Sequence, residues 1–297
     1  MVESTPAIDA ARESGRITEF ISRFVESRGV SGIALGLSGG LDSSVVAALC
    51  VRALGAKGVY ALLLPERDSS PESVRDASAL AEQLGIEYRV QDLTAALAEL
   101  GCYESAASDV ARLGGGTRAA VRMFPGLARK GYLANVTGGG GKHFHRFLAF
   151  HRIKHRLRMV SVYRAAEERN LVVASCANRT EHETGFFVRY GDDAGDCAPI
   201  KHLYKTHVFA VGRYLELPAS ILEKQPSPDL FSGMKDEEIM GITYETLDSI
   251  LWGFSAGLGT EEITGRFGID ATSVEYVIEM KRLSERMREA PASLVSK

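Results

Sequence analysis

A short glycine-rich segment carries the strongest chemical signal in this 297-residue sequence: Ser38-Gly39-Gly40-Leu41-Asp42-Ser43-Ser44. Its glycines allow the backbone to bend tightly and to bring several N–H groups close to an anion. The start of a following helix adds a favourable dipole, and the serine hydroxyls add further donors. The segment lacks the Gly-Lys-Ser/Thr ending of a Walker A motif and the spacing of a GxGxxG fingerprint. We therefore predict a different kind of phosphate-binding turn here.

Three charged residues can complete a phosphate site around this turn. Asp42 would repel a phosphate unless a divalent cation lay between them, so its presence predicts Mg²⁺. Glu181 is expected on a polar turn after the apolar run at 171–175 and can share that cation. Lys205 follows a short apolar run that ends in Tyr204, and its ammonium can neutralise charge that develops on a phosphorus centre. These residues predict a site that binds phosphate groups together with a magnesium ion.

The apolar pattern around these residues alternates between strand and helix. Short apolar runs at 33–37, 59–64, 86–90 and 171–175 predict buried strands, and helical spacing predicts helices at 17–25, 45–54, 73–84 and 147–169. Such an alternation is typical of a doubly wound α/β fold with a parallel sheet. Ligands bind at the carboxyl ends of the strands in such folds, where the turn and the charged residues fall.

Composition excludes several other classes of protein. The net charge of −3 disfavours a general nucleic-acid binder, and no apolar run reaches the length of a membrane span. The four cysteines are widely spaced and form no CxxC pair, which indicates neither a zinc site nor a disulfide framework. The first residues lack the apolar core of a signal peptide. We expect a cytoplasmic protein that binds neither nucleic acid nor membrane.

The chain is expected to form one catalytic domain over residues 1–297, with a helical C-terminal part from about 236 to 297. Glycine runs at 113–116 and 137–141 break the regular pattern. No element is predicted between 101 and 145, and residues 113–145 are interpreted either as an insertion that acts as a lid or as a disordered excursion.

Several ordered motifs resemble known families. The SGGxDS turn resembles the pyrophosphate-binding motif of the PP-loop, or N-type, ATP pyrophosphatases, whose fold is adenine nucleotide α-hydrolase-like. The second half resembles the ammonia-dependent NAD synthetases at six places: Arg152-Ile-Lys-His-Arg-Leu-Arg-Met159, Asn178-Arg-Thr-Glu181, Thr184 to Asp196, Leu203-Tyr-Lys-Thr206, Lys224-Gln-Pro-Ser-Pro-Asp229 and Asp236 to Asp248. So many ordered matches identify the chain as similar to that family.

The resemblance implies an ATP-dependent ligase that forms an amide. A carboxylate would attack the α-phosphorus of ATP, pyrophosphate would leave, and ammonia would displace AMP from the acyl adenylate. The most favoured acid is nicotinic acid adenine dinucleotide (deamido-NAD), amidated to NAD. Ammonia would come from solution or from a separate donor protein. The family also implies a homodimer.

The resemblance further implies roles for individual residues. Asp42 and Lys205 are implied as catalytic residues, and Asp42 and Glu181 as ligands of Mg²⁺. The residues implied in ATP binding are Gly36, Leu37, Ser38, Gly39, Gly40, Leu41, Asp42, Ser43, Cys176, Lys205 and Ser227. The acid substrate falls to Arg156, Arg189 and Asp196, whereas Lys154 and Arg158 are expected on a solvated helix face.

Four departures from the family pattern keep other functions open. Residues 113–145 form an insertion, Arg152 replaces an Asn, Asp193-Ala-Gly195 replaces Gly-Gly-Ala, and Arg286-Met-Arg288 replaces a His-Lys pair. A paralogue that amidates a different carboxylate is therefore the main alternative. A sulfur-inserting PP-loop enzyme, with Cys176 or Cys197 as carrier, is a second alternative. A helix-turn-helix DNA reader at 261–282 is a third, although its acidic residues favour a helix pair that covers the core or a dimer seam.

Overall fold

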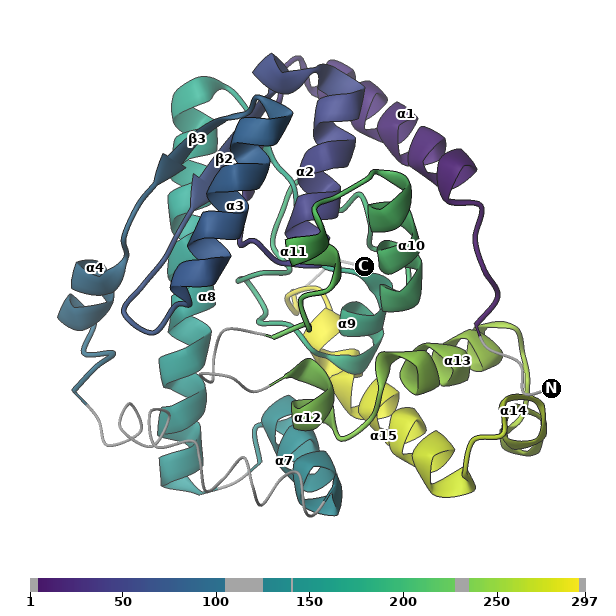
Figure 1. The fold of residues 1–297 in the computed structure, drawn as a ribbon. Helices are drawn as coiled ribbons and strands as arrows, with labels where there is room; N and C mark the ends of the chain where they lie inside the picture. Colours follow the sequence, from purple (N-terminus) through teal and green to yellow (C-terminus); the bar gives the residue numbers. More distant parts are fainter. Residues whose placement is uncertain (1–4, 105–124, 140, 228–234, 294–297) are drawn as a thin grey trace.

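A four-stranded parallel sheet forms the centre of the protein (Figure 1). The computed structural model describes residues 5–104, 125–139, 141–227 and 235–293. The strands are β1 (Ile33–Gly36), β2 (Val59–Leu63), β3 (Glu87–Val90) and β4 (Val172–Val173), in the order β3-β2-β1-β4. All neighbouring strands are parallel. The predicted α/β class with a parallel sheet is thus confirmed.

The helices of the described part surround this sheet and extend beyond it. They are α1 (Ala10–Arg28), α2 (Leu41–Leu54), η1 (Ala56–Gly58), α3 (Pro71–Leu84), α4 (Thr94–Glu99), α7 (Pro125–Thr137), α8 (Lys142–Arg169), α9 (Arg179–Thr184), α10 (Lys205–Tyr214), α11 (Ala219–Leu222), α12 (Asp236–Met240), α13 (Tyr244–Ser255), α14 (Thr260–Phe267) and α15 (Ala271–Arg288).

Alternating side chains of the strands pack into two separate hydrophobic clusters. Ile33 and Leu35 of β1 point to the face covered by α1, α2 and α10, where the largest cluster forms. Ala34 points to the opposite face, where it packs with Leu62 and with Val162 of α8. This period of two is the pattern that a parallel strand buried on both faces requires. The sheet is therefore covered by helices on both sides, as Figure 1 shows.

Two predicted elements have different bounds in the structure, one near the turn and one at β4. Helix α2 begins at Leu41 and not at Val45, so Asp42 lies in its first turn. The fourth strand is only two residues long, and Ala174 continues it with a single bridge to Cys197. The chain leaves the sheet there to form a wall of a pocket described below.

The segment without predicted structure contains a helix. Residues 125–137 form α7, and α8 begins at Lys142, five residues earlier than predicted. Tyr132 and Val136 of α7 are buried in a third hydrophobic cluster with residues of α13 and α15. The glycine run at 113–116 lies outside the described residues. The described part of this segment is therefore packed against the rest of the protein.

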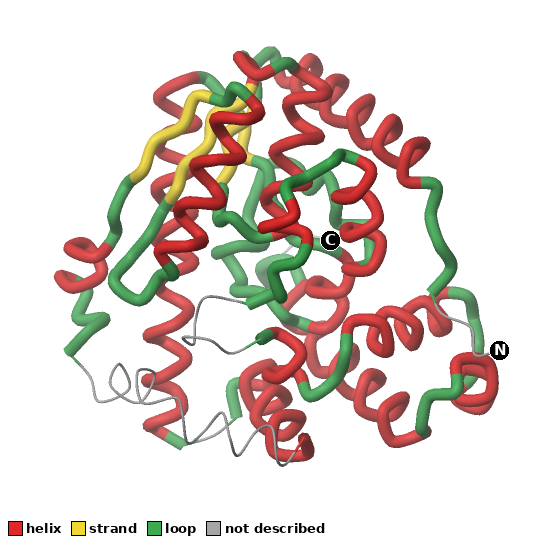
Figure 2. The backbone as a smooth tube through the Cα atoms, viewed as in Figure 1, coloured by secondary structure: helices red, strands yellow, loops and turns green. Residues whose placement is uncertain are grey.

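The C-terminal helices form a compact group beside the sheet (Figure 2). Ile263 and Phe267 of α14 and Val274 and Val277 of α15 are buried in the same cluster as α7. Gly268 adopts a left-handed φ of 62° and ends α14. The expected helix pair that covers the core is confirmed, because its apolar side faces inward. No helix within the described ranges combines the length and the apolar character needed to cross a bilayer.

Candidate active site

A pocket of about 340 Å³ opens at the carboxyl ends of β1 and β2. Its walls are formed by the Ser38–Ser43 turn (the phosphate turn), the residues after β2, helix α8 and the chain after β4. Predicted site residues that line it are Gly36, Leu37, Ser38, Gly40, Leu41, Asp42, Ser43, Cys176, Glu181, Lys205 and Ser227. The structure therefore brings the predicted nucleotide and metal residues together in one cavity.

The turn is held in shape by its own hydroxyl groups. Ser38 N donates to Ser43 Oγ at 3.2 Å, and the two hydroxyl oxygens lie 3.0 Å apart. Gly39 has a left-handed φ of 74°, and a Cβ atom there would lie 2.2 Å from the carbonyl oxygen of Ser73. Glycine is therefore required at Gly39 both by conformation and by space. The turn lies against the start of α3 and leads directly into α2.

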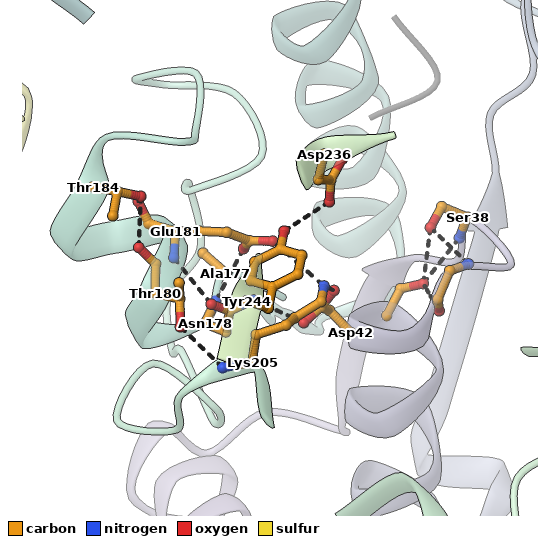
Figure 3. Close-up of polar contacts among 12 residues, drawn as sticks. Ser38, Asp42, Ala177, Asn178, Thr180, Glu181, Thr184, Lys205, Asp236 and Tyr244 are labelled. Atoms are coloured by element: carbon orange, nitrogen blue, oxygen red, sulfur yellow. Dashed lines mark hydrogen bonds and ion pairs between the residues drawn. The ribbon is translucent and has the colours of Figure 1, made fainter. Parts of the chain in front are cut away.

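A cluster of charged side chains lies at the start of α2 (Figure 3). Lys205 Nζ contacts Asp42 Oδ2 and lies 3.8 Å from Glu181 Oε1. Asn178 Nδ2 donates to the other oxygen of Asp42 at 2.9 Å. Asn178 also caps α9, where its side chain accepts from the backbone N–H of Glu181. Glu181 thus lies on a short helix and not on the polar turn that the sequence predicted.

Burial makes the charges of this cluster depend on one another. Lys205 is only 2% exposed. Burial alone would lower the pKa of Lys205, but the carboxylates of Asp42 and Glu181 outweigh it and raise the pKa. Burial, followed by repulsion from Asp42, raises the pKa of Glu181 well above its usual range. Two half-buried carboxyl groups with an ammonium between them form a position that suits a cation, so this pair can also ligate a hard divalent metal ion through oxygen.

Asp236 and Tyr244 extend the cluster, and sequence reasoning assigned them no role. Asp236 is 4% exposed and lines the pocket, and its Oδ2 accepts from the Tyr244 hydroxyl at 2.7 Å. Its Oδ1 has no hydrogen-bond partner among the described residues. Burial raises the pKa of Asp236 to about 6. Lys205 Nζ lies 5.3 Å from the centre of the Tyr244 ring, so Tyr244 lies between Lys205 and the carboxyl group of Asp236 that its hydroxyl contacts.

Lys224 ties the phosphate turn to α3. Its Nζ donates to Ser73 Oγ and Asp76 Oδ2, both at 3.0 Å, and lies 3.5 Å from the Gly39 carbonyl oxygen. The lysine also lines the pocket. It belongs to the motif that contains Ser227, which the sequence reading singled out alone. Its place in that motif was the available signal for Lys224.

Lys154 contradicts the solvated helix face expected for it. The side chain is 1% exposed, and Nζ donates to Glu66 Oε1 at 2.8 Å and to Asp68 Oδ2 at 2.9 Å. Its ammonium also lies 4.4 Å from the centre of the Phe150 ring. The network fixes the loop after β2 against α8. The sequence pattern missed this because the partner carboxylates lie more than 80 residues away.

Arg158 is also not solvated as expected. It lines the pocket, and its Nε donates to the carbonyl oxygen of Leu64 at 3.2 Å. Its second contact is to Ser69 Oγ, another lining residue, at 3.4 Å. The arginine therefore helps to position the loop that Lys154 anchors from the other side.

The three residues predicted to bind the acid substrate do not line the pocket. Arg156 Nε donates to the carbonyl oxygen of Arg189 at 3.2 Å, so these two residues are neighbours, but neither lines the pocket of the single chain. Asp196 is exposed, and its Oδ2 accepts from the backbone N–H of Val173 at 2.7 Å. Asp192 and His155 line the pocket instead, with 3.5 Å between His155 Nδ1 and Asp192 Oδ2.

Comparison with known proteins gives a consistent family. A family model described as NAD synthase matches residues 13–128 and 135–291. The protein named NH(3)-dependent NAD(+) synthetase from Thermotoga maritima is 39% identical over 278 residues, which cover 92% of this chain and 95% of that protein. The protein of the same name from Coprothermobacter proteolyticus is 37% identical over 292 residues, which cover 96% and 98%.

Solved structures give the same fold. NMN synthetase from Francisella tularensis superposes with a TM-score of 0.72 at 25% identity, over 97% of this chain and 99% of that chain. NAD+ synthetase from Burkholderia pseudomallei superposes with a TM-score of 0.60 at 25% identity, over 97% and 93%.

Proposed function

Because the chain belongs to the NAD synthase family, we propose that it amidates nicotinic acid adenine dinucleotide with ammonia at the expense of ATP. The predicted family and the predicted enzyme class, a ligase that forms a C–N bond, are confirmed by this membership. One observation carries the assignment of the site: Asp42, Glu181 and Lys205 meet at the helix start beside the Ser38–Ser43 turn, inside one pocket.

The proposed reaction has two steps. A carboxylate oxygen of the acid attacks the α-phosphorus of ATP, the bond to the bridging oxygen breaks, and pyrophosphate leaves with the electron pair. Ammonia then attacks the acyl carbon of the mixed anhydride, AMP leaves, and one proton is released. AMP is a far better leaving group than hydroxide, which is why ATP is needed.

The residues of the pocket suit these steps by position and charge. The N–H groups at the start of α2, together with the Ser38 and Ser43 hydroxyls, would hold the pyrophosphate portion. The Lys205 ammonium would stabilise negative charge on the α-phosphate, where charge changes most in the transition state. Holding the carboxylate and the phosphorus in contact supplies much of the remaining rate enhancement. No side-chain nucleophile is required.

Asp42 and Glu181 would hold a magnesium ion. Their carboxyl groups already lie around the Lys205 ammonium, which supports a position for positive charge here. The ion would neutralise phosphate charge when it is bound. We place the reaction in the cytoplasm, where ATP and ammonia are available, and a homodimer stays a prediction from the family resemblance.

A second candidate acid is nicotinic acid mononucleotide. The observation that favours it is the TM-score of 0.72 with the protein titled NMN synthetase. The two acids share the nicotinate carboxylate, so the same chemistry applies to both. They differ in the groups that the far end of the pocket must accommodate.

The test is a substrate comparison with the purified chain. The protein is incubated with ATP, Mg²⁺ and ammonium, and with either acid, and AMP, pyrophosphate and amide are measured. We expect AMP and pyrophosphate only when an acid is present, with a higher kcat/KM for the dinucleotide. A higher kcat/KM for the mononucleotide would favour the second candidate, and ADP as the product would reject both.

A further inference from the structure

The C-terminal end of α7 is held by two arginines from other helices. Arg152 of α8 donates to the carbonyl oxygen of Asn135 at 2.8 Å, and Arg286 of α15 donates to that of Val136 at 2.7 Å. The last carbonyls of a helix have no partner within the helix, and cations there are favoured by its dipole. These contacts fix the position of Asn135 between α8 and α15.

The orientation of the Asn135 amide follows from its contact with Arg152. Arg152 also reaches Asn135 Oδ1 at 3.2 Å. A guanidinium has only donors, so the amide oxygen must face it and the amino group must face elsewhere. No described residue accepts from Asn135 Nδ2, and Asn135 lines the same pocket as Asp42 and Lys205. The structure thus leaves two N–H donors of a fixed side chain available at the pocket wall.

The surroundings of Asn135 favour a negatively charged ligand atom. Burial, followed by repulsion from Arg156 and Arg286, lowers the pKa of Arg152. None of these three arginines forms an ion pair with a described residue, and each donates to a backbone carbonyl oxygen. Positive charge without a carboxylate partner attracts an anion.

We propose that Asn135 determines specificity for the acid substrate by donating from Nδ2 to a carboxylate or phosphate oxygen of that acid. Arg152 acts as its positioning residue. Arg152 stands where the resembling motif has an asparagine, so this chain departs from the motif at the residue that holds Asn135. The proposal rests on the proposed function, because it assumes that the acid occupies this end of the pocket.

The test uses Asn135→Asp and Asn135→Ala in the full chain. Aspartate keeps an oxygen for Arg152 but replaces the two donors with a charged acceptor. We expect the KM for nicotinic acid adenine dinucleotide to rise about 30-fold in Asn135→Asp and about 10-fold in Asn135→Ala, within the range of a lost hydrogen bond to a charged group. The KM for ATP should change less than about 2-fold, because the proposed contact is made to the acid alone. A general loss of structure would instead raise the KM values of both substrates.

A purely structural role predicts the opposite order of the two variants. If Asn135 served only as an acceptor for Arg152, aspartate would form an ion pair there and Asn135→Asp would behave like the wild type or better. That result would overturn the proposal, as would equal changes in both KM values. Lys130→Gln is the matched control, because it lowers the net charge by one unit, as Asn135→Asp does, but at an exposed position of α7. It should leave both KM values unchanged.

Two further arms complete the test. Binding of NAD, which retains the phosphates but lacks the carboxylate, identifies the contacted group: weaker NAD binding by Asn135→Asp indicates a phosphate, and unchanged NAD binding indicates the carboxylate. Arg152→Gln should raise the KM for the acid like Asn135→Ala, and an unchanged KM would remove Arg152 from the proposal. Wild-type protein that releases no pyrophosphate with either acid would reject the proposed function itself, whereas active wild type with an unaffected Asn135→Asp rejects only this inference.

Discussion

The two ends of the pocket are built in different ways. At the nucleotide end, eight consecutive residues from Gly36 to Ser43 run from a buried strand through a turn into a helix, so backbone geometry alone positions most of the groups. At the end that we assign to the acid, residues from α7, α8 and α15 meet through side chains that donate to carbonyl oxygens. The first arrangement is local in sequence, whereas the second depends on helices that are far apart in the chain.

The largest effect is expected from a substitution that disrupts only the nucleotide end of the pocket. Asp42→Asn removes the charge that pairs with Lys205 and, as we propose, ligates magnesium. We expect kcat to fall about 1,000-fold, or about 4 kcal/mol in the activation free energy. Pyrophosphate release at saturating substrates measures it.

The control for this variant is Asp270→Asn, because Asp270 also lies at the start of a helix but does not line the pocket. It should keep wild-type kcat. An Asp42→Asn enzyme within 5-fold of wild type would contradict the role of Asp42.

The next effect, of similar size but on stability, concerns the wall that both ends share. Lys154→Met leaves the buried carboxylate of Glu66 without its cation, which typically costs about 3–5 kcal/mol of unfolding free energy. The KM for ATP should rise as well, because the loop after β2 lines the pocket. Urea unfolding and steady-state kinetics measure the two effects.

The exposed Lys57 gives the matched control. Lys57→Met should alter the unfolding free energy by less than about 0.5 kcal/mol. Equal costs for Lys57→Met and Lys154→Met would show that the buried network contributes nothing.

A third effect sharpens the comparison through pH. Burial, with repulsion from Lys154 and His155, lowers the pKa of His151 to about 3. The folded state then binds fewer protons than the unfolded state below pH 6.5, so stability is lost as pH falls through that range. His151 should lower the free energy of unfolding by about 2 kcal/mol when the pH falls from 7 to 5.

Unfolding free energies of wild type and His151→Gln at pH 7 and pH 5 measure this contribution. The variant should lose about 2 kcal/mol less than wild type over that interval. His145→Gln, at an exposed position of the same helix, should keep the wild-type pH dependence. Identical pH dependence in His151→Gln would mean that His151 is protonated in the folded state.

The smallest effect belongs to Cys176. Burial raises the pKa of its thiol, so the side chain is neutral and a weak hydrogen-bond partner. Cys176→Ala should change kcat less than about 2-fold, and Cys176→Thr should change the KM for ATP by a similar factor. Complete loss of activity in Cys176→Ala would instead support the sulfur-carrier alternative.

Sequence reasoning succeeded where the backbone carries the information. Local patterns predicted the strand that ends at Gly36 and the helix that follows the turn. Strand order then predicted that Asp42, Glu181 and Lys205 would meet in one cavity. It failed for Lys154, because a basic residue on a helix gives no sign of carboxylates that approach from another loop.

The acid end was also beyond the reach of local pattern. Helix α7 follows a glycine-rich stretch and has a weak apolar pattern, so nothing in the sequence predicted its packing on α15 or the contact between Asn135 and Arg152. Asp196 was singled out by its motif, yet its side chain accepts from the backbone of β4. The structure of the acid end is therefore determined by contacts between helices that are far apart in the sequence.

The ammonium of Lys205 between Asp42 and Glu181 has a consequence for the order of binding. It acts as a built-in counter-ion, so a free metal ion must compete with a charge that the protein already holds in place. Metal delivered together with nucleotide brings phosphate oxygens to which the lysine can transfer. The protein is therefore expected to take up the metal and ATP as one complex, and calorimetry with Mg²⁺ alone should show no saturable uptake.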